Sequence, residues 1–149
     1  MMPRPASALR RFQRCDRGIA ALEFALLAPP LLMLAFGIAV YSIYFSAYMG
    51  VRQAASEGAR AAMAGLDSNE RTQFATVRAE QVIDNYGAIF ASGDGPQVTA
   101  APIGVGVFEV RVSYDMAAHP IIRFTPFIPL PQTEIVSAVV ALFIPRNVR

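Results

Sequence analysis

The chain has 149 residues, of which 54% are apolar and 16% are charged, whereas an average soluble domain has roughly 25% charged residues. The length fits one domain, and the apolar content excludes disorder as the main state because there is ample apolar surface to bury. A single cysteine excludes an internal disulfide. One cysteine and one histidine are also too few for the usual ligands of a structural zinc site.

The net charge of +2 hides an uneven distribution of charge along the chain. All 13 basic residues are arginines, and residues 1–17 hold five of them against one aspartate, a charge of +4. Residues 19–149 hold eight arginines against ten acidic residues, a charge of −2. The basic character therefore belongs to the N-terminal tail. Because a nucleic-acid-binding domain needs a basic face, we expect no nucleic-acid partner.

Residues 19–51 form an apolar segment of 33 residues with one charge, Glu23. As a helix at 1.5 Å per residue the segment is about 50 Å long, whereas a bilayer core needs only about 20 residues. It predicts a transmembrane helix that projects beyond the lipid. The arginines before it indicate a cytoplasmic N-terminus, a single pass through the inner membrane and a periplasmic C-terminal domain. Tyr41, Tyr44 and Tyr48 fit either an aromatic belt at the far interface or packing between helices.

Glu23 is the exception in this apolar segment, because a carboxylate at the bilayer centre costs on the order of 2.5–3.5 kcal/mol. One interpretation places it at the headgroups beside Arg17. The other begins with the order of residue types: a basic leader, Gly18, four apolar or small residues and then Glu23 form the pattern of a type IV prepilin processing site. Cleavage after Gly18 leaves a free amine on Ile19, which the Glu23 carboxylate neutralises in the same or a neighbouring subunit.

The segment RGIAALEFALLAPPLLMLAFG, residues 17–37, resembles the start of TadE-like proteins, the minor pseudopilins of the tight-adherence (Flp-type) pilus system. Residues 53–60, QAASEGAR, are similar to the Ala-rich helix end of that family. The resemblance covers most of residues 17–64 and extends loosely beyond them. It implies processing by a prepilin peptidase after Gly18 and a structural role in the assembly of an adhesive pilus, with other pilin or pseudopilin subunits as partners of the N-terminal helix.

Two further patterns lie along the predicted helix, which we expect to end near Gly65. Pro29 and Pro30 predict a kink near residues 26–30, since proline removes a helix hydrogen bond. Small residues recur every fourth position, and at this spacing two helix backbones can approach closely. The candidate helix-packing residues are Ser42, Ser46, Gly50, Ala54 and Gly58. The alternative is a chance result of Ala-rich composition. Glu57 and Arg60 are spaced to form a surface ion pair.

The rest of the chain predicts a small domain. Asp67 or Ser68 is expected to cap a helix over residues 69–86, whose apolar positions are Phe74, Val77, Val82, Ile83 and Tyr86. Alternation predicts a half-buried strand over 105–114, with strands at 97–103 and 133–144. The expected fold class is α+β: a long N-terminal transmembrane helix followed by a small exported domain with one short helix and an antiparallel sheet. The expected parts are a cleaved leader 1–18, the helix 19–65 and the domain 66–149.

The stretch 119–131 contains four prolines among large apolar residues. Proline interrupts regular strand pairing, so we expect an extended apolar loop. It packs either on the domain's own sheet or against a partner, and the candidate contacts are Ile121, Phe124, Phe127 and Ile128. The last strand is apolar on both faces, which predicts that the long helix covers one face and another subunit the other.

We find no sequence pattern for catalysis. The histidine, His119, is expected in a loop or at the surface without a signalled partner, and no Gly-rich loop precedes a helix as a phosphate site requires. We therefore expect no enzyme activity, no cofactor and no metal. The leading hypothesis is a TadE-like pseudopilin. The alternative is an uncleaved single-pass envelope scaffold or binding module, and processing at Gly18 separates the two.

Overall fold

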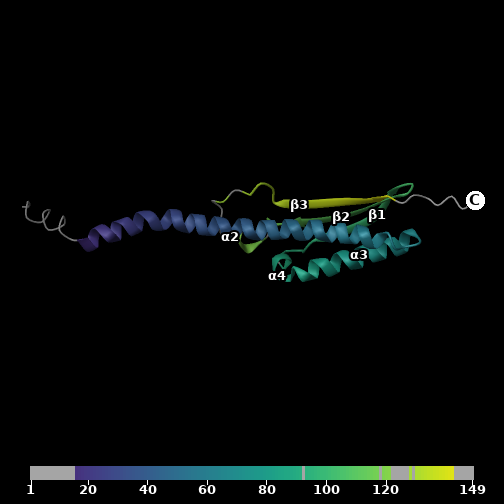
Figure 1. Ribbon diagram of the computed structural model, residues 1–149, viewed down its shortest axis with the longest axis horizontal. Helices are drawn as coiled ribbons and strands as arrows, with labels where there is room; N and C mark the ends of the chain where they lie inside the picture. Colours follow the sequence, from purple (N-terminus) through teal and green to yellow (C-terminus); the bar gives the residue numbers. More distant parts are fainter. Residues whose placement is uncertain (1–15, 92, 118, 122–127, 129, 143–149) are drawn as a thin grey trace, which may run out of the picture. The chain divides into compact units, whose positions relative to one another are not determined.

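The computed structural model describes residues 16–91, 93–117, 119–121, 128 and 130–142, with side chains from residue 18 onward. The described residues form a long helix α2, two shorter helices and a three-stranded sheet, which are labelled in Figure 1. The elements are α2 (Asp16–Ala62), α3 (Ser68–Asn85), α4 (Gly87–Phe90), β1 (Gln97–Gly104), β2 (Val107–Asp115) and β3 (Glu134–Leu142). This order confirms the predicted α+β class. The four-residue helix α4 was not predicted.

The chain forms two compact units, residues 1–38 and residues 39–149. In the first unit, the described residues form the beginning of α2, and most of their apolar side chains are exposed. The segment Gly18–Ala62 is the one helix of the described residues that is long and apolar enough to cross a membrane. Pro29 and Pro30 lie inside α2 and do not end it, so the predicted kink stays a prediction.

The second unit begins well before residue 66, where the sequence placed the start of the domain, because the last part of α2 belongs to its core. From Val40 to Ala62, α2 carries a line of buried small and branched residues: Val40, Ala47, Val51, Ala54, Ala55, Ala59 and Ala62. With few atoms beyond Cβ, these side chains let other elements pack close to the helix axis. Two adjoining core clusters join this part of α2 to α3, β2 and β3.

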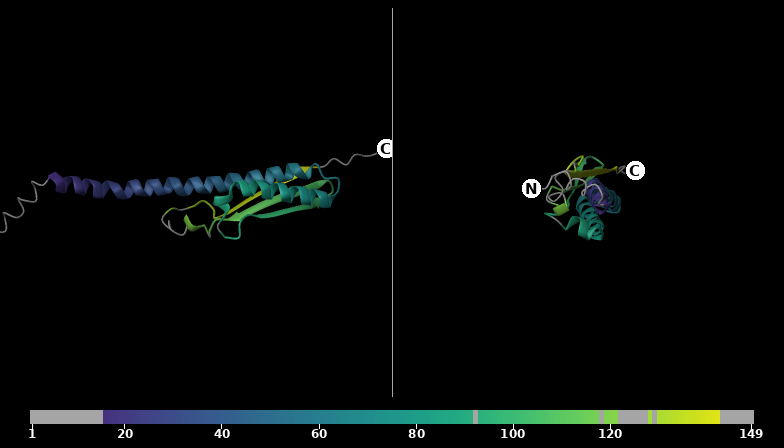
Figure 2. Two further views of the ribbon diagram at one scale, coloured as in Figure 1. Left: turned by 90° about the horizontal axis from the view of Figure 1, so that it is seen from below. Right: turned by 90° about the vertical axis from the view of Figure 1, so that its left-hand side faces the viewer.

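The sheet is antiparallel with the order β1-β2-β3, so β2 is central and β1 and β3 are edges. The predicted alternation in β2 is confirmed, since Phe108, Val110, Val112 and Tyr114 are buried while the intervening side chains are not. The buried residues share one core with α2 and α3, and Figure 2 shows both helices on the same face of the sheet. The opposite face is open in the part of the chain that the structure describes.

Helix α3 begins where the sequence predicted. The Asp67 carboxylate accepts hydrogen bonds from the backbone N–H groups of Asn69 (2.8 Å) and Glu70 (2.9 Å), which satisfies two donors that a helix start leaves unpaired. The Glu70 side chain accepts in turn from the backbone N–H of Leu66 (2.9 Å). Gly65 is needed for close packing here, because a Cβ at this position would lie 2.7 Å from the backbone nitrogen of Arg71.

Candidate functional site

The predicted processing residues lie at the start of α2. Gly18, Ile19 and Glu23 are all exposed, and Ile19 retains 51% of its surface. Ile19 and Glu23 are four residues apart in the helix, so they lie one turn apart on the same side. Among the described residues, no ion pair or hydrogen bond holds the Glu23 carboxylate.

The helix beyond Glu23 presents large apolar side chains around its circumference. Phe24 (73% exposed), Leu26 (75%) and Leu31 (61%) are typical of residues 19–38. Exposed apolar surface of this extent is unusual on a water-facing helix and marks contact with lipid or protein. The first unit thus offers a lateral surface that fits either a bilayer or the helices of neighbouring subunits.

The small-residue series divides between two environments. Ser42 is exposed and Ser46 half-buried, with the Ser46 hydroxyl donating to the Ser42 carbonyl (2.9 Å). Gly50, Ala54 and Gly58 are buried inside the second unit. A Cβ on Gly58 would lie 3.0 Å from the Ala75 carbonyl oxygen of α3 and 3.1 Å from a methyl of Val110 in β2. These three positions hold the chain's own elements together; packing against a partner helix remains a prediction.

The three tyrosines of α2 also separate. Tyr44 is 9% exposed and belongs to the core of the second unit, so it is a packing residue. Tyr41 and Tyr48 remain partly exposed. The Arg52 guanidinium lies 5.5 Å from the centre of the Tyr48 ring and donates to its hydroxyl at 3.4 Å. Tyr41 and Tyr48 thus keep the exposure that an interfacial belt requires.

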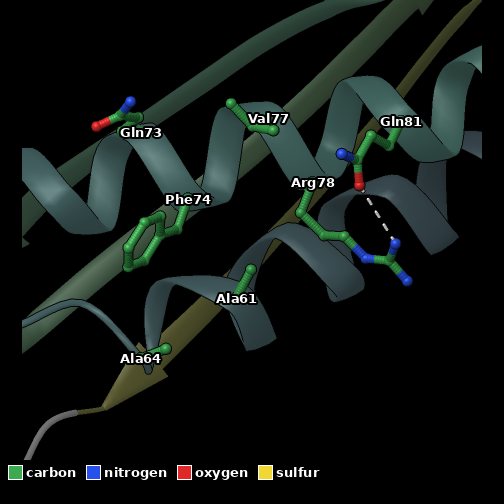
Figure 3. A pocket seen from close by; sticks show the side chains of 7 residues that line it. All are labelled: Ala61, Ala64, Gln73, Phe74, Val77, Arg78 and Gln81. Atoms are coloured by element: carbon green, nitrogen blue, oxygen red, sulfur yellow. Dashed lines mark hydrogen bonds between the residues drawn. The ribbon is translucent and has the colours of Figure 1, made fainter.

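A groove of about 410 Å³ lies between the end of α2 and α3 (Figure 3). It is lined by Ala61, Ala64, Gln73, Phe74, Val77, Arg78 and Gln81. Phe74 and Val77, expected on the apolar face of the helix, are 42% and 47% exposed, and Ala75 and Ala79 face the core instead. Helix α3 packs closely on α2 at Gly58, so the residues of α3 that face this glycine are the small Ala75 and Ala79. Phe74 and Val77 lie on other sides of α3. At the groove, Arg78 pairs with Glu57 (3.4 Å), where the sequence indicated a Glu57–Arg60 pair.

A second, more polar hollow of about 620 Å³ lies beside the turn before β1, where Asp94, Asp115 and Glu134 contribute carboxylates. Asp115 and Glu134 are direct partners across β2 and β3. The Asp115 carboxylate already accepts from the backbone N–H of Ala117 (2.8 Å). Across the described residues, no group of three or more His, Cys, Asp or Glu side chains is arranged to hold a metal ion.

The Pro-rich stretch is described only in part. Phe124 and Phe127, two of the four candidate partner contacts, lie outside the described residues, while Ile121 and Ile128 are half-buried. His119 lies outside the helices and strands, as the predicted loop position requires, but it is buried, with 9% of its surface exposed. The backbone N–H of His119 donates to the Met116 carbonyl (2.9 Å), and this hydrogen bond closes a turn. The Met116 side chain is buried. The Nδ1 atom of His119 accepts from the backbone N–H of Ile121 (3.3 Å).

Burial lowers the pKa of His119 below its usual value, because desolvation disfavours the imidazolium. As the pH falls below about 6.5, the ordinary pKa of histidine, His119 takes up a proton in the unfolded chain before it does so in the folded chain. Protonation therefore favours the unfolded chain. The stability that depends on neutral His119 is fully present above about pH 6.5 and is lost as the pH falls through the lowered pKa of the folded chain. We expect the urea midpoint of the chain in detergent micelles to fall on acidification below pH 6.5, and His119→Asn to reduce that fall. If the urea midpoint of His119→Asn fell with acidification as steeply as that of the wild type, His119 would not be the cause of the fall.

Residues 18–60 of the chain match the protein family described as TadE-like protein. A search of curated proteins and a search of solved structures each found no match. The matched segment begins at the predicted processing glycine, includes Glu23 and ends with the segment QAASEGAR. The match agrees with the resemblance that the N-terminal motif predicted: residues 18–60 are similar to the TadE-like family.

Proposed function

We propose that this chain is a minor pseudopilin-like structural subunit for the assembly of a tight-adherence pilus, processed by a prepilin peptidase after Gly18. The TadE-like segment implies a role related to that pilus system. The observation that carries the finer proposal is the coincidence of three features at one helix start: the match begins at Gly18, Glu23 stands exposed four residues after Ile19, and large apolar side chains follow.

The same features support a single-pass arrangement in the inner membrane. The arginine-rich residues 1–17 stay in the cytoplasm, the apolar start of α2 lies in the lipid, and the second unit is periplasmic. After cleavage, the helix moves laterally to neighbouring pilin or pseudopilin subunits. In a low-dielectric surrounding, pairing of the Ile19 amine with a Glu23 carboxylate offsets much of the cost of burying either charge.

Intact mass of the membrane protein tests the processing step. In cells with an active prepilin peptidase we expect a mature chain that begins at Ile19, and in cells without the peptidase the full chain. Gly18→Val should block cleavage because a side chain hinders close approach of the protease to the backbone. Gly37→Val is the matched control, since Gly37 lies in the same helix with nothing within 4 Å of an added Cβ. Retention of the leader under all conditions would favour the uncleaved scaffold.

Glu23→Ala tests the assembly step separately. We expect normal membrane insertion, because the substitution removes a charge from an apolar helix, but loss of pilus assembly, because the new amine at Ile19 then lacks its counter-charge. Glu23→Asp keeps the charge and should retain part of the assembly. Glu80→Ala, which removes an exposed carboxylate in α3, is the control. Surface pili at the wild-type level in Glu23→Ala would contradict the role of this carboxylate.

A further inference from the structure

The end of the second unit at which α2 enters, at residue 39, is almost free of charge. Residues 39–51, the first part of α2 in this unit, carry no charged side chain. Residues 116–133, which connect β2 to β3, carry one, Arg123. In contrast, residues 52–115 carry 13 charged side chains. Two segments that are distant in the sequence therefore share a composition that the residues between them lack.

Ring contacts place the end of β2 beside Gly50, which is the last residue but one of the charge-free part of α2. A Cβ on Gly50 would lie 2.8 Å from the Phe90 ring. The Phe90 ring in turn meets the Tyr114 ring, with centroids 4.9 Å apart. Tyr114 is the last residue but one of β2. The residues that follow β2 therefore begin at the level of Gly50.

The connection from β2 to β3 continues from this level along α2 toward residue 39. Tyr44 precedes Gly50 by about 9 Å along the helix, and it is buried. It belongs to the same core cluster as Met116, and the half-buried Leu130 packs against that cluster. Figure 2 shows the described parts of the connection at this end of the sheet. Residues 39–51 and the described residues of 116–133 thus form one end of the unit, called here the entry end.

Charged side chains mark the boundary of the entry end on both segments. On α2 the first is Arg52, which follows Gly50 closely. On the sheet the first are Asp115 and Glu134, which lie opposite each other across β2 and β3. The Arg52 guanidinium lies 5.5 Å from the centre of the Tyr48 ring and donates to the Tyr48 hydroxyl at 3.4 Å. A long side chain that covers apolar surface while its charged group stays in water is typical of a lipid–water boundary.

The exposed side of α2 at the entry end is apolar and aromatic. The exposed fractions are 36% for Tyr41, 57% for Phe45, 37% for Tyr48 and 64% for Met49. From Arg52 to the end of α2, the exposed positions are polar or charged instead. Exposed apolar side chains that adjoin one another mark a contact surface, and tyrosine, with an apolar ring and a polar hydroxyl, is enriched where lipid meets water. The composition of this side therefore fits a lipid interface.

We propose that the entry end is seated among the lipid headgroups of the periplasmic leaflet, so that the second unit rests in the membrane surface and does not stand clear of it. This rests on the single-pass arrangement proposed above, but not on cleavage or on the pilus role. Residues 19–38 lead directly into the unit, and about 20 residues are needed to cross the hydrocarbon core. No spacer therefore separates the lipid from residue 39, and this continuity selects lipid over a protein as the occupant.

Tryptophan fluorescence tests this seating, because the chain has no tryptophan of its own. The full chain is placed in vesicles of phosphatidylethanolamine and phosphatidylglycerol in which part of the acyl chains carry bromine, which quenches tryptophan on contact. Phe45→Trp and Ala117→Trp report on the two segments of the entry end, where both residues are exposed. Phe74→Trp is the matched control, since Phe74 is exposed on α3 beside Ala61 and Ala64, near the other end of the unit.

Leu31→Trp, in the proposed span, shows whether the chain has inserted into the vesicle. We expect bromine to reduce the emission of Leu31→Trp, Phe45→Trp and Ala117→Trp but not that of Phe74→Trp. Bromine near the headgroup should quench Phe45→Trp more than bromine at the end of the acyl chain does, whereas Leu31→Trp should show the opposite order.

The failure of this proposal differs from the failure of the single-pass arrangement. Quenching of Leu31→Trp without Phe45→Trp or without Ala117→Trp would overturn the seating of the entry end and leave the span in place. Absence of quenching in all four variants would overturn the span and the seating together. Emission of Phe45→Trp at short wavelength without quenching would also overturn the seating, because protein and not lipid would then cover this residue. Equal quenching of Phe74→Trp would mean that the contact is not confined to the entry end, and would overturn it as well.

Discussion

Tyr114→Ala should lower the free energy of unfolding of the second unit by about 3–5 kcal/mol, the usual range for loss of a large aromatic side chain from a core. Among the described residues, Tyr114 is the largest of the fully buried side chains, with 2% exposure. Its ring meets the Phe90 ring edge-on, with centroids 4.9 Å apart, and its hydroxyl donates to the Ile89 carbonyl at 3.3 Å. Removal of the ring therefore disconnects β2 from α4. The measurement is the urea midpoint of the full chain in detergent micelles, followed by near-ultraviolet circular dichroism.

Tyr114→Phe separates the contribution of the hydroxyl from that of the ring. It keeps the contact with Phe90 and should cost only about 0.5–1.5 kcal/mol for the lost hydrogen bond. A midpoint for Tyr114→Ala as high as that for Tyr114→Phe would show that the ring does not support the core as described.

Tyr114→Phe also has an expected effect on alkaline unfolding. Burial, with a smaller effect of the neighbouring Asp115 carboxylate, raises the pKa of the Tyr114 phenol above its usual value. Above about pH 10 the unfolded chain loses a proton that the folded chain retains, so stability falls as the pH rises. The phenylalanine variant should lose part of this alkaline sensitivity.

Gly58→Leu should destabilise the same unit by about 1–3 kcal/mol or more, because extra atoms in a packed interior force side chains and backbone apart. The first added carbon already lies 3.0 Å from the Ala75 carbonyl oxygen and 3.3 Å from the Ala79 Cβ. Both belong to α3, which would have to move away from α2. The expected result is a lower urea midpoint with weaker near-ultraviolet circular dichroism, while membrane insertion is retained.

Gly87→Leu is the matched control for this change. Gly87 is exposed at the start of α4, and nothing lies within 4 Å of an added Cβ. The substitution should leave the midpoint nearly unchanged, since exposed sites without special contacts tolerate replacement. Equal losses at the two glycines would mean that the α2–α3 contact does not depend on Gly58.

The elements with strong local signals were predicted well. The alternation in β2 reflects burial of one face only, and the Asp67 cap reflects a short side chain that reaches the first N–H groups of a helix. The family of the N-terminal segment was also predicted correctly, because Gly18, Glu23 and the apolar residues after them lie close together in the chain. Such features need no knowledge of distant residues.

Features that depend on contacts between distant elements were not predictable in the same way. The start of the compact unit at residue 39 depends on which side of α2 the sheet covers. The exposure of Phe74 and Val77 follows from the contact of Ala75 and Ala79 with Gly58, which lies on another helix. The burial of His119 likewise requires the turn at Met116.

The sequence by itself determined the apolar N-terminal helix, the similarity of residues 18–60 to TadE-like proteins, and the α+β order of elements. Periodicity, charge and short-range spacing are enough to specify these. Only the tertiary structure decided that the small residues Gly50, Ala54 and Gly58 serve the chain's own core, and that the register with β2 shifts in β1 but not in β3. The physical reason is that a residue is buried, or a strand paired, by contact with another helix or strand, and that partner is distant in the sequence.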